Sequence, residues 1–216
     1  MTWLSHTWGW VLELTWAHLW LSLPAIVLSA AIAVPVGRLA FRRPRLGGPL
    51  LSGASLLYAI PALPLLIIVP AILAVPLRSS ATIIIALTIY GAALMVRTAA
   101  DAFASVDPHV RQAALAVGHS PRELFWKVDL PLAVPVLVAG LRVVTVSTVG
   151  LVTIGALIGV PSLGTLFTDG FQRGIVAEVV TGLVATVVVA LALDALCLLA
   201  GRALTPWHRA TAGAGT

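Results

Sequence analysis

Long apolar runs separated by short polar segments dominate the pattern along this chain. A helix that spans a membrane needs about 20 predominantly apolar residues. The pattern predicts such helices at about 19–41 (with an alternative start near Val11), within 46–77, and at about 81–100, 132–158 and 175–200. Each run is rich in Leu, Ile, Val and Ala and contains few charges. The sequence therefore predicts an all-α membrane protein with about five transmembrane helices.

The stretch 46–77 is the ambiguous one. Its 32 residues would form a straight helix of about 48 Å, longer than a hydrocarbon core of about 30 Å. Two spans of roughly 15 residues each would be too short to cross. Prolines are tolerated in membrane helices where neighbours satisfy the freed carbonyls, so we expect one kinked span. The prolines in this stretch are Pro49, Pro61, Pro64, Pro70 and Pro76.

The cationic residues favour one orientation of these spans. Cytoplasmic connections of membrane proteins carry an excess of Lys and Arg. If 46–77 crosses once and the N-terminus is outside, only Arg78 and Arg173 are loop cations on the outer side. Splitting 46–77 would move the connection at 101–131 to the wrong side. We therefore predict an outside N-terminus and a cytoplasmic C-terminus. The inner loop cations are then Arg38, Arg42, Arg43, Arg45, Arg111, Arg122, Lys127, Arg202 and Arg209.

The composition excludes soluble classes of protein. Hydrophobic residues make up 60% and charged residues 10% of the chain, against about 45–50% and about 25% in soluble domains. The single cysteine, Cys197, excludes an intramolecular disulfide, and the histidines show no metal-ligand spacing. The chain has no phosphate-binding glycine loop with a lysine, since its only lysine is Lys127, and no nucleophile motif. We therefore expect no enzyme and no nucleic-acid binding; the net charge of +5 reflects membrane topology.

The two ends of the chain are expected to differ from the spans. Residues 1–18 contain four tryptophans, and Trp20 follows shortly after. Tryptophan is enriched at membrane–water interfaces, so this segment is predicted to be an interfacial anchor on the outer face. An aromatic cage for a ligand is the alternative. Residues 208–216 are expected to form a flexible tail.

The connection that precedes the fourth span has a pattern of its own. Asp107-Pro108 is typical of a helix start, and Gly118 of the left-handed position that ends a helix. Ser120-Pro121-x-Glu123 has the spacing of a capping box at a second helix start. We therefore expect a helix, a glycine turn and a second helix, which lead into Leu130-Pro131. An ordered connection of this length indicates a function.

These residues resemble the cytoplasmic EAA loop of bacterial ABC-importer permeases. The pattern (E)AA-x3-G-x11-LP is matched by Gln112-Ala113-Ala114, Gly118 and Leu130-Pro131. Over roughly residues 15–207 the chain is similar to the osmoprotectant branch, the permease subunits of glycine betaine, carnitine and choline importers. The supporting strings are Ala59-Ile60-Pro61-Ala62-Leu63, Arg97-Thr98, Asp129-Leu130-Pro131-Leu132-Ala133, Ala139-Gly140-Leu141-Arg142, Ile154-Gly155-Ala156 and Leu163-Gly164.

The resemblance implies a type I ABC-importer permease fold over 19–207, in a multi-pass protein of a bacterial cell membrane. Its implied partners are an ATPase subunit that binds ATP and magnesium, a second identical or similar permease, an extracellular solute-binding protein and membrane lipid. No cofactor is expected in this chain. The implied cargo is a quaternary ammonium osmoprotectant. The alternatives are an ABC permease for another solute, such as an amino acid, and a non-transport five-span scaffold.

The resemblance also assigns the loop at 110–131 as the coupling segment that docks on the ATPase. Gln112 stands where the family usually has Glu, so an ion pair with the ATPase would become a neutral and weaker hydrogen bond. The implied coupling residues are Arg111, Gln112, Ala113, Ala114, Gly118, Leu130 and Pro131.

Polar residues within apolar runs are the remaining candidates, because such groups usually face a bundle interior or water. Arg97, Arg142 and Asp194 lie towards the cytoplasmic half, and Asp194 is expected to pair with one of the two arginines, as a structural ion pair or as part of the pathway mouth. Glu178 is expected at the outer interface, and His18 in a packing role. The aromatic candidates for the pathway are Tyr58 and Tyr90. Gly155, Gly159 and Gly164 are candidates for an outer gate and permease interface, with Gly155-x3-Gly159 permitting close helix approach.

Overall fold

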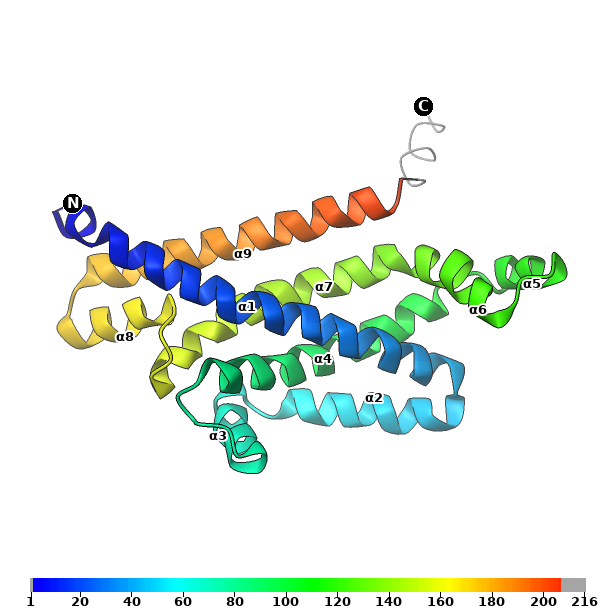
Figure 1. Cartoon of the computed structure of the whole chain (residues 1–216), viewed down its shortest axis with the longest axis horizontal. Helices are drawn as coiled ribbons and strands as arrows, with labels where there is room; N and C mark the ends of the chain where they lie inside the picture. The colour runs from blue at the N-terminus through cyan, green and yellow to red at the C-terminus, as the bar shows by residue number, and fades with distance from the viewer. Residues whose placement is uncertain (1, 207–216) are drawn as a thin grey trace.

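The computed structural model describes residues 2–206, and side chains from residue 7 onward; every regular element in that range is helical (Figure 1). The expected tail at 208–216 lies outside the described residues. Four long helices form the body of the protein: α1 (Thr2–Arg42), α4 (Ser80–Ala104), α7 (Leu130–Val152) and α9 (Val176–Leu204). Each contains a stretch long and apolar enough to cross a membrane. The expected spans at 19–41, 81–100, 132–158 and 175–200 lie on these helices.

Helix α1 is a single helix that includes the tryptophan-rich segment. Its 41 residues would extend about 60 Å, about twice the hydrocarbon thickness. Trp8, Trp16 and Trp20 are all more than half exposed and lie at spacings of four or eight residues. They therefore form a stripe along one face of α1 and do not converge on a point, which is the arrangement of an anchor more than of a cage. The interfacial position of this stripe stays a prediction.

Helix α4 lies at the centre of the fold. It packs against α1, α7, α2 and α3, and 61% of its apolar window is buried. Helix α9 packs mainly on α7 and on the short helix α8 (Gly164–Arg173), and only 11% of its apolar window is buried. The chain therefore presents the apolar side of α9 to its surroundings, either lipid or another protein.

The expected kinked span at 46–77 is a broken one. It consists of α2 (Pro44–Ala59) and α3 (Ala62–Leu73), which meet at 108°. The break falls at Ile60, which is extended (φ −70°, ψ 125°), because the residue before a proline is disfavoured in the α region and Pro61 cannot donate a backbone hydrogen bond. Pro49 and Pro70 lie inside helices. The count of crossings is thus four, or five if this bent pair is one span.

The outer end of the fourth span also differs from expectation. The α-helix stops at Val152, a 3-10 turn follows over Thr153–Ile158, and α8 begins at Gly164. Gly159 has φ +83°, so Gly155-x3-Gly159 does not form a helix-packing stripe within the chain: Gly159 ends the turn. A side chain at Gly164 would clash with the Thr153 carbonyl. The helix α8 itself was not anticipated.

The two ends of the bundle carry different charges. One end holds the α1–α2 corner, the helices at 108–124 and the C-terminal end of α9, and the opposite end holds α8 and the N-terminus (Figure 1). The described cations predicted to be cytoplasmic thus share one end, which supports the proposed orientation. They are Arg38, Arg42, Arg43, Arg45, Arg111, Arg122, Lys127 and Arg202.

Candidate functional site

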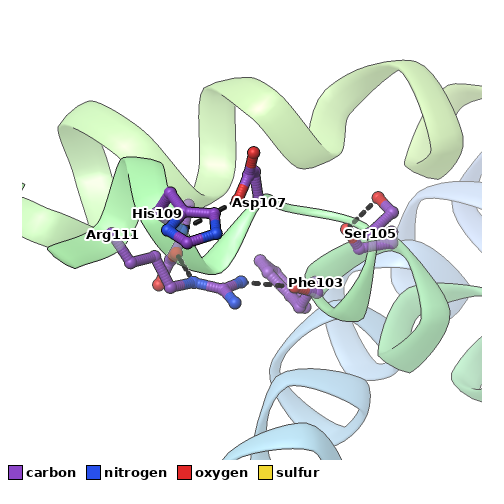
Figure 2. A network of polar contacts seen from close by, with 7 residues as sticks. Phe103, Ser105, Asp107, His109 and Arg111 are labelled. Atoms are coloured by element: carbon purple, nitrogen blue, oxygen red, sulfur yellow. Dashed lines mark hydrogen bonds and ion pairs between the residues drawn. The ribbon is translucent and has the colours of Figure 1, made fainter. Parts of the chain in front are cut away.

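The loop between α4 and α7 begins with a capped short helix, α5 (Pro108–Ala116). The Asp107 carboxylate accepts a hydrogen bond from the His109 backbone N–H at 2.8 Å (Figure 2). At the other end Gly118 adopts φ +91°, and the His119 and Gly118 N–H groups donate to the Ala114 and Leu115 carbonyls. This is the Schellman arrangement, which favours glycine at the left-handed position. The predicted helix and glycine turn are confirmed.

The second half of the loop has the predicted capping box. Ser120 Oγ accepts from the Glu123 N–H, and the Glu123 carboxylate accepts from the Ser120 N–H. The short helix α6 (Pro121–Leu124) then leads into a π-helical turn at Phe125–Asp129, and α7 begins at Leu130. Such π-turns occur frequently at functional sites. The structure therefore connects the loop to the fourth span without a flexible segment.

Arg111 anchors α5 to the membrane helices. Its Nε donates to Asp129 Oδ1 at 2.6 Å, and its Nη2 donates to the Phe103 carbonyl at the end of α4 (Figure 2). The guanidinium also lies 4.7 Å from the centre of the Phe41 ring on α1. Both charged side chains are largely buried, at 17% and 13% exposure. One arginine thus joins this loop to the adjoining ends of α1, α4 and α7.

A second anchor joins α1 to the π-helical turn. The Arg38 guanidinium stacks 3.4 Å above the centre of the Phe125 ring, and Phe125 also packs against Phe103, with the ring centres 6.2 Å apart. A cation over an aromatic face is attracted by the ring quadrupole. Sequence reasoning missed this anchor: Arg38 was assigned only to topology and Phe125 to no role. Because Arg38 and Phe125 are 87 positions apart in the chain, no local sequence pattern indicated this contact.

Several apolar side chains of the loop are exposed to its surroundings. The apolar side chains Val110, Leu115, Val117 and Trp126 are 42–78% exposed. Gln112 and Ala113 are exposed beside them, whereas Ala114 is buried and Leu130 and Pro131 are half-buried. Exposed apolar groups rimmed by polar residues mark interaction sites. These exposed apolar side chains make the loop a candidate docking surface for another protein.

Within the bundle, Asp194 pairs with Arg142. Two hydrogen bonds of 2.7 Å join Arg142 Nε and Nη2 to the two carboxylate oxygens. Of the two arginines that were candidates for this ion pair, Arg142 is the one that contacts Asp194. Arg97 is exposed on α4. One turn away, Thr145 Oγ1 lies 3.5 Å from Cys197 Sγ. A bidentate pair fixes geometry as well as charge, and this one fixes α9 against α7.

The two tyrosines of the candidate pathway lie together on other helices. The rings of Tyr58, in the last turns of α2, and Tyr90, on α4, are 4.9 Å apart and tilted by 42°. Tyr58 is 42% exposed. The pair therefore forms an aromatic surface next to the break at Ile60. Its exposure towards a substrate is not fixed by the single chain, so its pathway role stays a prediction.

The outer end holds a buried acid that was expected at the interface. Glu178 is fully buried at the start of α9, and among the described residues neither carboxylate oxygen has a hydrogen-bond partner. The neighbouring helix α8 carries Asp169, which accepts from Arg173 Nη1 at 2.8 Å. That hydrogen bond lowers the pKa of Asp169 below its ordinary value. The structure adds that Glu178 is covered within the chain by α8, a helix that the sequence analysis did not predict, and its interfacial position stays a prediction.

Nothing in the described part of the chain gathers metal ligands. Across that part, no three or more His, Cys, Asp or Glu side chains come together where they could hold an ion. The features described above define a class: a helical membrane protein whose ordered, capped loop exposes apolar side chains at one end of the bundle.

Sequence comparison identifies the family within that class. Residues 25–209 match the family described as "Binding-protein-dependent transport system inner membrane component", and the chain belongs to it. It is the permease subunit of an ABC importer and a multi-pass protein of the bacterial inner membrane. The relatives found in the comparison are permease subunits, which are not themselves enzymes.

Curated relatives cover nearly the whole chain. It is 30% identical over 204 residues to the osmoprotectant import permease protein OsmW of Salmonella typhimurium, covering 92% of this chain and 93% of the relative. It is 28% identical to the choline transport system permease protein OpuBB of Bacillus subtilis, covering 92% and 90%.

A solved structure supports the fold. An inward-facing conformation of the MetNI methionine ABC transporter superimposes with a TM-score of 0.79 at 24% identity, covering 90% of this chain and 96% of that one. The prediction of a type I ABC-importer permease fold is confirmed.

Proposed function

We propose that this permease imports a quaternary ammonium osmoprotectant, such as glycine betaine, carnitine or choline. The observation that carries the proposal is the near full-length similarity to permeases named for osmoprotectant, choline and carnitine transport. The Tyr58–Tyr90 pair gives secondary support, because aromatic faces attract quaternary ammonium groups. Few other aromatic side chains lie in the spans, so selectivity is assigned mainly to an external binding protein.

We propose that movement of the ATPase is transmitted to the permease at residues 110–131, the docking loop. The partner ATPase supplies the chemistry of ATP and magnesium when it is bound. This chain's part is mechanical: the exposed face around Val117 and Gln112 contacts the ATPase, and the buried Arg111–Asp129 pair transmits displacement of α5 to α7. Arg38 on Phe125 transmits the same displacement to α1. Access to the pathway then alternates by rigid-body movement between two states.

The remaining partners are assigned from the uncovered surfaces. A second permease, identical or similar, is proposed to cover the apolar side of α9, which the single chain leaves exposed. The solute-binding protein is proposed to dock at the opposite end, on the turn from Gly159 to Gly164 and on α8. The basic residues at the loop end support a cytoplasmic position for the docking loop, and Gly155, Gly159 and Gly164 are then proposed to lie at the outer gate.

The test is uptake by the reconstituted complex. The permease is placed in proteoliposomes with its ATPase and binding protein, and uptake of radiolabelled glycine betaine, carnitine, choline and methionine is measured with ATP inside. ATP-dependent uptake of at least one quaternary ammonium compound, exceeding that of methionine, is expected. Uptake of methionine alone would replace the proposed cargo with an amino acid. Binding of each labelled solute to the isolated binding protein is the control for cargo selection.

A further inference from the structure

His18 makes a specific contact between two membrane helices. It lies on α1 with no exposed surface, and its Nε2 is 3.0 Å from the Val149 carbonyl oxygen on α7. A carbonyl oxygen only accepts hydrogen bonds, so Nε2 must carry the proton. Its Nδ1 is buried and has no hydrogen-bond partner in the part of the chain that the structure describes. The polar function of this side chain is thus a single donation to α7.

The Val149 carbonyl needs that donor because α7 changes its winding there. In a continuing α-helix it would accept from the N–H of Thr153, four residues on. The Thr153 N–H instead donates to the Gly150 and Leu151 carbonyls as the 3-10 turn begins. Val149 is fully buried, and a buried carbonyl without a donor destabilises the fold. His18 supplies the missing donor from another helix.

Side chains satisfy other carbonyls of the same helix end. Thr153 Oγ1 donates to Gly150 O at 2.6 Å, and Ser162 Oγ donates to Val152 O at 3.3 Å. The last four carbonyls of any α-helix lack intrahelical partners, so these donors act as a C-terminal cap. Of the three donors, His18 is the one that lies far away in the sequence, and it fixes this end of α7 to α1.

We propose that His18 is a positioning residue that determines where α7 ends and the outer turn at Thr153–Ile158 begins. It thereby holds the segment that carries Gly155 and Gly159 in the geometry seen in this conformation. As a gating role, this inference rests on the proposed function, because the outer turn matters for transport only if it borders the pathway. As a structural role, it rests on the Val149 contact alone.

The test uses variants that separate the hydrogen bond from the volume of the ring. In His18→Gln the amide nitrogen reaches about the position of Nε2, whereas in His18→Asn it ends near the position of Nδ1 and cannot reach Val149. Ser22→Ala is the matched control. Its hydroxyl, also buried on α1, donates within α1 to the His18 carbonyl at 2.8 Å and makes no tie to α7.

Two measurements are made on the complete transporter in lipid: backbone hydrogen exchange of the peptide covering 150–160, and the number of solutes imported per ATP hydrolysed. The exchange measurement needs no cargo, so it tests the positioning role even if the proposed cargo is wrong. We expect His18→Asn to raise exchange about tenfold, as loss of one buried hydrogen bond predicts, and to lower the coupling ratio. His18→Gln and Ser22→Ala should stay close to wild type in both measurements.

Two results would overturn the inference. If His18→Asn leaves the exchange of 150–160 unchanged, the Val149 contact does not position this segment. If His18→Gln is as damaging as His18→Asn, the shape of the ring matters and the hydrogen bond does not. If exchange rises while the coupling ratio is unchanged, the structural role holds and the gating role is rejected.

Discussion

Arg111 and Asp129 form a nearly buried ion pair between the first helix of the docking loop and the turn from which α7 starts. Their side chains meet at 2.6 Å, and Arg111 also donates to the carbonyl of Phe103 on α4. These contacts join the loop to two membrane helices, so we expect a displacement of the loop to be passed to both.

Removing one partner of this pair should uncouple the transporter. Asp129→Asn leaves the Arg111 guanidinium largely buried without its counter-ion, which costs about 3–5 kcal/mol for buried pairs and loosens the loop. We expect ATP hydrolysis to continue while solute uptake falls, measured as the ratio of the two in proteoliposomes. Glu123→Gln is the control, because it breaks the exposed pair with Lys127, which contributes about 0–1 kcal/mol. Equal coupling in both variants would contradict a transmitting role for Asp129.

The local parts of the site were predictable because their chemistry is local. Asp107, Gly118 and the Ser120–Glu123 box each contact backbone groups within a few residues. Their spacing in the sequence therefore determines which groups they can reach. The Arg38–Phe125 contact joins segments far apart in the chain, and no spacing rule reports it. The burial of Glu178 was not predictable for the same reason, since it depends on how α8 packs against α9.

For the fold, the positions of the long helices were predictable from the sequence, whereas the position of the break in the second span was not. Apolar runs of sufficient length locate the long helices, because the membrane requires about 20 such residues in each. They do not show which of five prolines breaks a span: Pro49 and Pro70 stay inside helices, and the break falls at Ile60-Pro61. That choice depends on how α2 and α3 pack against α4. A helix as short and polar as α8 carries no comparable signal of length.

The left-handed turn at Gly118 should tolerate very few residue types. Its φ of +91° is strained for residues with a Cβ, and worst for β-branched ones. We expect Gly118→Val to destabilise the turn by about 1–2 kcal/mol and to reduce co-purification of the ATPase and solute uptake together. Gly118→Asn should do less harm, because Asn visits this region more readily. Nothing packs where a Cβ would lie, so a loss shared equally by both variants would point to a steric conflict with the ATPase.

The Arg142–Asp194 pair should behave as one unit. Either Arg142→Met or Asp194→Leu leaves an unpaired charge between α7 and α9 in a partly buried, apolar setting, whereas the double variant removes both charges together. We expect each single variant to lower the thermal midpoint of the detergent-solubilised complex and the double variant to recover most of the loss. If the stable double variant still fails to import solute, the pair serves the pathway as well as the packing.

The orientation can be tested with single cysteines in a Cys197→Ala background. Val117, in the docking loop, is 78% exposed, and Val176, at the start of α9 beside α8, is 73% exposed. Because the two positions lie at opposite ends of the bundle, a membrane-impermeant thiol reagent added to intact cells should label Val176→Cys and spare Val117→Cys. In inside-out vesicles the pattern should reverse. Labelling of Val117→Cys in intact cells would place the docking loop outside, where no ATPase can reach it, and the proposed mechanism would then fail at its first step.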